Sequence, residues 1–186
     1  LSDASSAIST QSTFSQDSSA PFVICLDPGH GPGESNPGSV SHGLKECNLT
    51  LSIANYCKAA LEKYPDVKVI MTHDGKTGTS DLYERVNDAV DAGADVYVSL
   101  HMNAIDGSAS MTAHGAEVWY PNGSSYKRDQ VALGVTLSAN ILNRLSALGL
   151  YSRGAKTYDY PDGYDSSTYP DGSKADYYAV IRYARK

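Results

Sequence analysis

The chain has 186 residues, enough for one domain with a buried core. Its 21 acidic and 15 basic residues give a formal net charge of −6, which argues against binding to nucleic acid or to an anionic membrane surface. No segment approaches the ~20 consecutive apolar residues of a membrane-spanning helix, so no membrane span is expected.

The N-terminal segment, LSDASSAISTQSTFSQDSSA, is rich in serine and threonine and contains few large apolar side chains. Such a segment buries too little apolar surface to offset the conformational entropy lost on ordering it. We therefore interpret residues 1–20 as a linker or tail and expect the folded unit at residues 21–186.

Strands and helices alternate after residue 21, each with its own apolar pattern. FVICL at 22–26 is almost entirely apolar and ends at Asp-Pro-Gly, which is typical of a strand buried on both faces. Further strands are predicted at 67–72, 96–100 and 116–120, and helices with apolar stripes at 46–63, 80–93 and 127–148. This alternation implies right-handed crossovers and a three-layer α/β fold with a mostly parallel sheet.

The pattern changes in the C-terminal part of the chain. Residues 151–175 are rich in Tyr, Asp, Pro and Gly, and the turn sequence YPDG occurs at 160–163 and again at 169–172, so this segment is predicted to be a long loop. Its tyrosines could stack on a sugar or peptide ligand, or pack against one another over the domain. The apolar run YYAVIRYA at 177–184 is predicted to be a further strand.

The three cysteines do not suggest a disulfide or a thiolate metal site. Cys47 and Cys57 lie on one predicted helix, about 15 Å apart at 1.5 Å rise per residue, which is too far for a disulfide. No Cys-x-x-Cys pair is present. We interpret these two residues and Cys25 as small buried side chains.

Two predicted strands are followed by histidine. His30 stands in DPGHG, between two glycines, and His101 follows VSL. Carboxyl ends of parallel strands meet at one edge of a sheet, where ligands bind, so both histidines are expected at that edge. Either histidine alone would be read as an ordinary surface or core residue.

Glu46 begins the predicted helix 46–63, which should start above the same edge. A glutamate there also complements the helix dipole, which is a sufficient structural reason for it on its own. Beside two converging histidines, however, it completes a His/His/Glu set with an open fourth position, the arrangement of a catalytic zinc site. The sequence therefore predicts Zn²⁺ as the cofactor.

Four separated motifs carry a resemblance to a known family: VICLDPGHGPG, HGLKECNLTLSIA, DLYERVNDAVDAGADVYVSLHMNA and HGAEVWYP. In this order, over about residues 22–156, the chain resembles the zinc-dependent N-acetylmuramoyl-L-alanine amidases, the catalytic domains that cut peptidoglycan. The resemblance implies a mixed sheet of about six strands flanked by helices, with His30, Glu46 and His101 as zinc ligands. It implies hydrolysis of the amide between the lactyl group of N-acetylmuramic acid and the L-alanine of the stem peptide.

One feature of that family has no counterpart here. The family carries a second glutamate near the end of its last strand, where it serves as general base. No glutamate follows Glu117, and Glu117 itself matches a framework position within the predicted strand 116–120. We therefore expect the catalytic domain to be C-terminally incomplete, without its last strand and with the base beyond Lys186. Loss of a general base typically slows turnover by ~10²–10⁴-fold, so this chain should bind zinc but turn over poorly.

Three other residues near these motifs are assigned structural or substrate-binding roles. Arg85 matches an arginine position of the family, and we expect a helix-surface ion pair with Asp81 or Asp88. Asn103 is expected to orient the loop that carries His101 by a local side-chain hydrogen bond, and it is also a candidate substrate contact. His114 could reach the cleft as a substrate contact, or be an exposed histidine.

The two remaining histidines are interpreted as loop residues. His42 lies four residues before Glu46, so it is retained as an alternative metal ligand, whereas His73 is given no role in the site.

Two other functions remain open at this stage. A zinc carboxypeptidase would need an arginine to hold a free carboxylate, for which Arg153 and Arg182 are the candidates. A non-catalytic cell-wall-binding module would use the loop 151–175 as its contact surface. The principal interpretation is a monomeric peptidoglycan amidase that is secreted or associated with the cell wall.

Overall fold

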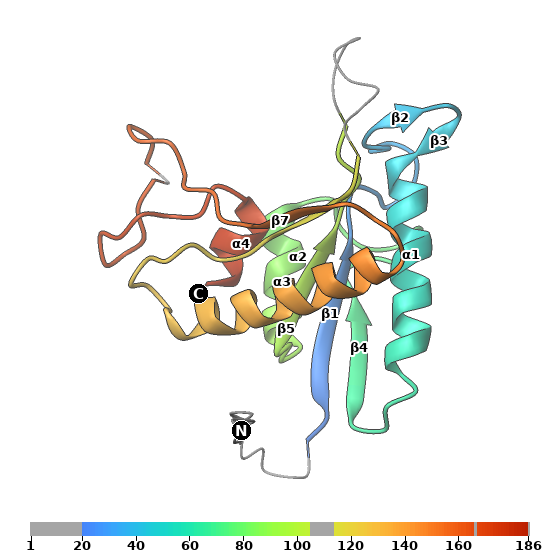
Figure 1. Cartoon of the computed structure of the whole chain (residues 1–186), viewed down its shortest axis with the longest axis horizontal. Coiled ribbons are helices and arrows are strands. Elements are labelled where there is room, and N and C mark those ends of the chain that lie inside the picture. The colour runs from blue at the N-terminus through green and yellow to red at the C-terminus, as the bar shows by residue number, and fades with distance from the viewer. Residues whose placement is uncertain (1–19, 105–113, 166, 186) are drawn as a thin grey trace, which may run out of the picture.

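The structure is a computed structural model that describes residues 20–104, 114–165 and 167–185, and it has the predicted α/β class (Figure 1). Its centre is a parallel sheet of three strands in the order β4-β1-β5. These strands are β1 (Phe22–Pro28), β4 (Val67–Met71) and β5 (Val96–Leu100). The predicted tail 1–20 lies outside the described residues except for Ala20.

Helix α1 (Glu46–Leu61) packs against β1 and β4 and forms the main apolar core with them. Leu26, Ala54 and Val69 are buried at its centre, and Ile24, Cys57, Leu61, Val67, Met71, Val98 and Leu100 pack around them. The alternation of strand and helix thus produces the predicted layering, because each apolar strand face is covered by the apolar stripe of a helix.

A short hairpin precedes α1 and was not predicted. It pairs β2 (Val40–Ser41) with β3 (Leu44–Lys45) in antiparallel register and leads directly into Glu46. Two residues per strand are too few for an alternating pattern, which explains why the sequence does not indicate it.

Helix α2 (Leu82–Asp91) begins at the predicted cap. The Asp81 carboxylate accepts hydrogen bonds from the backbone N–H groups of Tyr83 and Glu84, which satisfies two free donors of the first turn. Gly93, with a φ of 72°, follows the helix as its stop. The helix predictions for 46–63, 80–93 and 127–148 are confirmed, the last as α3 (Asp129–Ala147).

Helix α3 packs against a second parallel pair, β6 (Ala116–Trp119) and β7 (Ser152–Lys156). The predicted strand 116–120 is therefore confirmed, but the described strands divide among three sheets rather than forming one sheet of about six. Strand β7 corrects the prediction that 151–175 is loop throughout. Its sequence SRGAK has no apolar alternation, and its strand conformation depends on backbone pairing with β6.

The predicted strand at 177–184 is wrong, because Ala179–Ala184 form helix α4, which packs against α2. A short apolar run is compatible with a strand or a helix, and its periodicity cannot decide between them. The Arg182 guanidinium donates back to the carbonyls of Asp176 and Tyr177, which ties α4 to the preceding segment.

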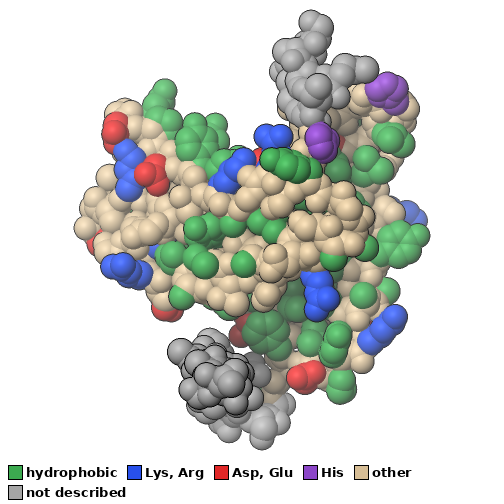
Figure 2. Space-filling model, in the orientation of Figure 1, with side chains coloured by type: hydrophobic (Ala, Val, Ile, Leu, Met, Phe, Trp, Pro, Cys, Tyr) green, Lys and Arg blue, Asp and Glu red, His purple; other side chains and the backbone are tan. Residues whose placement is uncertain are grey.

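The tyrosines between β7 and α4 pack largely against one another. Tyr158 and Tyr177 have ring centroids 4.4 Å apart, and Tyr169 stacks at 4.8 Å on Tyr126, which precedes α3. Hydrophobic side chains also reach the surface over this segment, at the left of Figure 2. Internal packing, one of the two predicted roles of these tyrosines, is therefore observed.

All three cysteines are free, as predicted; Cys25 and Cys47 are buried, and Cys57 is half-buried. Burial, and then the nearby Asp27, raises the pKa of the Cys25 thiol to about 12, so it stays protonated. Within the described ranges, none of the helices combines the length and the apolar character that crossing a membrane requires.

Candidate metal centre

His30 lies on the turn that follows β1. Its backbone φ is 66°, in the left-handed region that side-chain-bearing residues rarely adopt. The ring Nδ1 lies 3.2 Å from Asn36 Oδ1, an acceptor, so Nδ1 carries the proton and Nε2 is free to bind a metal. The turn therefore presents one ring nitrogen toward α1.

Glycines on both sides of this turn make room for the imidazoles. A Cβ at Gly38, where φ is 67°, would lie 2.4 Å from the His30 ring and 2.7 Å from the Glu46 carboxylate. A Cβ at Gly29 would lie 2.6 Å from the His101 ring. Gly29, one of the two glycines beside His30 in the sequence, thus makes space for His101.

Glu46 is the first residue of α1, and only 4% of its side chain is exposed. One carboxylate oxygen accepts the N–H of Ser39 at 3.0 Å and the other that of Met102 at 2.8 Å. The hairpin before α1 and the segment after β5 thus fix both oxygens of this side chain.

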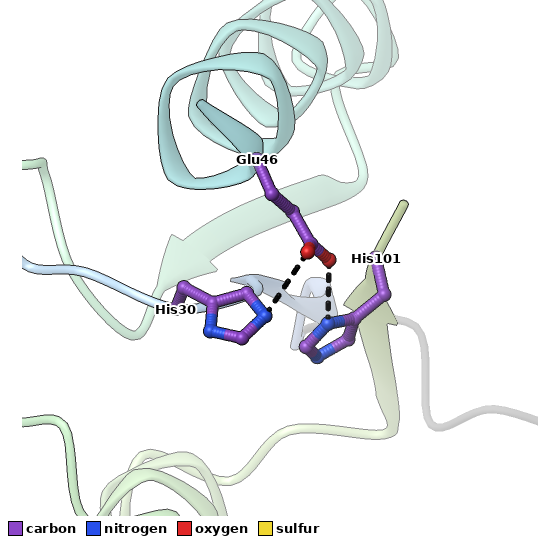
Figure 3. A group of neighbouring side chains, drawn as sticks. All are labelled: His30, Glu46 and His101. Atoms are coloured by element: carbon purple, nitrogen blue, oxygen red, sulfur yellow. Dashed lines mark hydrogen bonds and ion pairs between the residues drawn. The ribbon is translucent and has the colours of Figure 1, made fainter. Parts of the chain in front are cut away.

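His101 follows β5 and, with His30 and Glu46, forms the candidate metal-ligating group (Figure 3). Its Nδ1 lies 3.0 Å from Glu46 Oε1, and His30 Nε2 lies 3.2 Å from Glu46 Oε2. One ligand atom from each of the three residues lies within 4.8 Å of the others. The structure therefore brings together the three residues that the sequence singled out. His101 is 48% exposed, which leaves the group open to solvent on that side.

The Glu46 carboxylate is held in its charged form. Burial alone would raise its pKa, but the N–H groups of Ser39 and Met102 and the two imidazoles bring the pKa below its ordinary value. An ionised carboxylate between two imidazoles is a suitable donor set for a divalent cation.

The other two predicted loop histidines lie outside this group. His42 is exposed, its Nδ1 lies 2.8 Å from Ser41 Oγ, and it is not part of the metal-ligating cluster found among the described residues. His73 lies in the loop between β4 and α2, as predicted, and its side chain is buried. Its Nδ1 accepts the N–H of Gly75, so its Nε2–H donates to the Pro28 carbonyl at 2.8 Å.

Arg85 is not a surface residue, which corrects the predicted ion pair with Asp81 or Asp88. Only 1% of its side chain is exposed, and its Nη1 lies 2.9 Å from Asp27 Oδ1. The residue shares the buried face of α2 with Val86 and Ala89. Sequence periodicity treats a charged residue as solvent-facing, and only the position of Asp27 at the end of β1 reveals the inward orientation.

Asn103 lies near the end of the described part of its loop, and among the described residues its side chain bonds to Glu117. Its Nδ2 donates to Glu117 Oε1 at 2.8 Å, and the same carboxylate accepts from Lys156 Nζ at 2.6 Å and Arg153 Nε at 3.1 Å. These contacts, Lys156 foremost, lower the pKa of Glu117 to about 2. A carboxylate with so low a pKa is a poor general base, which agrees with its interpretation as a framework residue.

Replacing Glu117 by glutamine is expected to lower the free energy of unfolding by about 1–3 kcal/mol at neutral pH, because charged hydrogen bonds are lost. The native pKa of about 2 lies below the ordinary value of 4.5, so the carboxylate stabilises the fold above pH 4.5. This contribution is lost as the pH falls through about 2. Urea unfolding of both proteins should therefore show a difference that shrinks across this window. A difference independent of pH would contradict the assignment.

His114 is exposed, and its ring centroid lies 5.5 Å from that of Tyr151. It is not part of the metal-ligating group. A contact between His114 and a substrate remains a prediction, as does one from Asn103.

A cavity of about 330 Å³ lies beside the metal-ligating group. It is lined by Ser39, Ser41, His42, Leu44, Glu46, Leu49 and Met102. The hairpin β2–β3 thus contributes one wall of a recess that contains the Glu46 carboxylate.

Comparison with known proteins identifies a family for this chain. Residues 24–182 match the family described as N-acetylmuramoyl-L-alanine amidase, Amidase_3. N-acetylmuramoyl-L-alanine amidase LytC of Bacillus subtilis (strain 168) is 36% identical over 136 residues, which are 73% of this chain and 25% of LytC. The probable amidase AmiB of Haemophilus influenzae is 39% identical over 106 residues, which are 54% of this chain and 22% of AmiB. The chain thus spans about a quarter of the length of these curated relatives.

Two solved structures share the fold. The N-acetylmuramoyl-L-alanine amidase of Clostridium difficile 630 is 30% identical with a TM-score of 0.60, over 74% of this chain and 69% of that one. The catalytic domain of CwlV from Bacillus (Paenibacillus) polymyxa is 29% identical with a TM-score of 0.56, over 72% of this chain and 68% of that one. Since the family match extends over most of the chain and its fold recurs in both enzymes, the chain belongs to the N-acetylmuramoyl-L-alanine amidase family.

Proposed function

We propose that this chain is a zinc-dependent hydrolytic domain that cleaves the amide between the lactyl group of N-acetylmuramic acid and the L-alanine of the stem peptide in peptidoglycan. The observation that carries the proposal is the convergence of His30, Glu46 and His101 in a chain of this family. Peptidoglycan as substrate implies action outside the cytoplasm, and we propose that the protein acts there as a monomer.

The donor set favours zinc. Zinc lies about 2.0–2.1 Å from histidine nitrogen and carboxylate oxygen in tetrahedral sites, so neighbouring ligand atoms are about 3.3 Å apart. His30 Nε2 lies 3.2 Å from Glu46 Oε2, and His101 Nδ1 lies 3.0 Å from the other carboxylate oxygen, Oε1, so each imidazole is near this spacing from one oxygen of Glu46. When bound, zinc lowers the pKa of water toward 7 and polarises a carbonyl group, which is the chemistry that amide hydrolysis needs.

The chain's own residues prepare the site for this chemistry. The N–H groups of Ser39 and Met102 orient the Glu46 carboxylate and keep it ionised. Asn36 accepts the Nδ1–H of His30 and so keeps the Nε2 lone pair available. The recess beside Glu46 has apolar walls from Leu44 and Leu49, and we propose that it receives a part of the muramyl peptide next to the scissile amide.

The arginines required by the carboxypeptidase alternative are engaged elsewhere. Arg153 bonds to Glu117, and Arg182 donates to the carbonyls of Asp176 and Tyr177. Both arginines are thus partly engaged within the fold, and the family match favours the amidase over the carboxypeptidase.

The test is metal analysis combined with product analysis of the full-length protein, purified without chelators. We expect one zinc per chain and, by mass spectrometry of digested peptidoglycan, free stem peptides that begin with L-alanine. Chelator-treated protein is the control and should release none. Protein without zinc, or release of single C-terminal amino acids instead, would contradict the proposal. Retention on cell walls after metal removal, without hydrolysis by the untreated protein, would favour a wall-binding module.

A further inference from the structure

The turn that carries His30 is held through its backbone carbonyl oxygens. All four carbonyls of Pro28–Gly31 accept hydrogen bonds from side chains that are buried in the fold. The Pro28 carbonyl accepts from His73 Nε2 at 2.8 Å and from Arg85 Nη1 at 3.1 Å, and the Gly29 carbonyl accepts from Thr50 Oγ1 at 2.9 Å. Arg85 Nη2 donates to the carbonyls of His30 at 2.7 Å and Gly31 at 2.9 Å.

Arg85 uses every N–H of its guanidinium. Besides the three carbonyls of the turn, its Nη1 bonds to Asp27 Oδ1 at 2.9 Å and its Nε donates to the Thr79 carbonyl at 2.8 Å. Five donors thus meet five acceptors in a side chain that is 1% exposed. A lysine could neutralise Asp27, but its single ammonium has three donors and no planar fork.

The anchor of this arginine is itself fixed to the central sheet. The Asp27 carboxylate accepts from Thr72 Oγ1, just after β4, at 2.7 Å and from Ser99 Oγ, on β5, at 2.6 Å. Through Asp27, the guanidinium is therefore fixed to the carboxyl ends of all three strands of the central sheet. The metal-ligating group lies at the same edge.

The turn needs such support because His30 has a positive φ of 66°, which is sterically unfavourable for a residue with a Cβ. The carbonyls of His30 and Gly31 both point at one guanidinium nitrogen, so Arg85 sets the orientation of the peptide units on the C-terminal side of His30. Thr50 stands one helical turn after Glu46 on α1, and its single O–H lies closer to the Gly29 carbonyl (2.9 Å) than to the carbonyls of Glu46 (3.1 Å) and Cys47 (3.2 Å) in its own helix. The bond to Gly29 links the helix that carries Glu46 to the turn that carries His30.

We propose that Arg85, with His73 and Thr50, forms a carbonyl clamp that positions His30 for metal binding. Arg85 is its central positioning residue, and it acts on the metal through the backbone of the turn. The inference rests on the proposed metal site and assigns a role to three residues that are not ligands.

The test compares Arg85→Lys with the wild-type protein in zinc affinity, measured by competition with a chromophoric chelator, and in the visible spectrum of the Co²⁺-substituted protein. Loss of outer interactions around metal ligands typically weakens metal binding by about 10- to 100-fold, and we expect a loss in this range with an altered Co²⁺ spectrum. The matched control is Val86→Ala, which removes a fully buried side chain from the adjacent position of α2. This control should unfold at lower urea concentration yet keep wild-type zinc affinity and the wild-type Co²⁺ spectrum.

Wild-type affinity and spectrum in Arg85→Lys would overturn the clamp, as would an equal loss of affinity in Val86→Ala. If circular dichroism shows that Arg85→Lys does not fold, Thr50→Val carries the test, because it removes the hydroxyl that bonds Gly29 at nearly constant volume. The loss of one hydrogen bond predicts a decrease in zinc affinity of about 2- to 10-fold, and unchanged affinity there would overturn the proposal. A wild-type protein that binds no metal would overturn the proposed function itself. This result is distinct from the outcomes that test the clamp, because those compare variants with a wild-type protein that binds zinc.

Discussion

Replacement of Glu46 by alanine is expected to abolish zinc binding and the cleavage of muramyl peptides by the intact protein. Glu46 is the one anionic member of the ligating group, and both imidazoles lie within 3.2 Å of its oxygens. Two neutral imidazoles alone leave zinc short of the three protein ligands that catalytic sites provide. Metal content after dialysis and the release of stem peptides, followed by mass spectrometry, measure the two effects.

Glu62→Ala is the matched control for this prediction. Glu62 follows the last turn of the same helix and forms an exposed ion pair with Lys58, so its removal should alter stability by less than about 1 kcal/mol and leave zinc content unchanged. Zinc content and activity at the wild-type level in Glu46→Ala would refute the ligand assignment. Equal losses in both variants would point to a general effect on α1 instead.

Replacement of Arg185 by methionine is expected to lower the free energy of unfolding by about 3–5 kcal/mol. Arg185 is 1% exposed, and its Nη1 bonds to Asp176 Oδ2 at 3.0 Å and to Asn122 Oδ1 at 2.9 Å. Asp176 also accepts the hydroxyl of Tyr169 at 2.6 Å, so the pair connects the tyrosine-rich segment to the chain before α3. Removal of the cation leaves a buried carboxylate without its partner. Urea denaturation measures the loss.

The double variant Arg185→Met with Asp176→Asn separates the ion pair from general packing. It removes both charges, so it should be more stable than Arg185→Met alone, because no uncompensated buried charge remains. A loss below about 1 kcal/mol in the single variant would show that the pair does not stabilise the fold. A double variant less stable than the single variant would assign the effect to packing.

Local patterns in the sequence were sufficient for much of the fold. Apolar runs such as FVICL and VYVSL, and the apolar stripe of 46–63, report burial directly, because each pattern repeats within one element. The same logic placed His30 and His101 at the carboxyl ends of neighbouring strands, and Glu46 at the helix start above them. The structure brings these three side chains together.

Errors occurred where conformation depends on residues far away in the chain. Ser152–Lys156 is a strand because β6 pairs with it, and Ala179–Ala184 is a helix that packs on α2; neither segment has a distinctive pattern of its own. The bonds that Glu117 accepts from Asn103, Arg153 and Lys156 were missed for the same reason. A glutamate inside a strand, with an Arg-x-x-Lys sequence at 153–156 later in the chain, is a signal that could have suggested these ion pairs.

By itself, the sequence determined the α/β class, the positions of the main strands and helices, and the three residues expected to meet at the edge of the sheet. These follow from short-range periodicity and from the rule that parallel strands deliver their ends to one side. Only the tertiary structure decided that Arg85 turns inward onto Asp27 and that the His30 turn is held by its carbonyls. Arg85 is 54 to 58 residues away in the chain from Asp27 and from the carbonyls of the turn that it binds. These groups come together, and the guanidinium becomes buried, only when the chain folds.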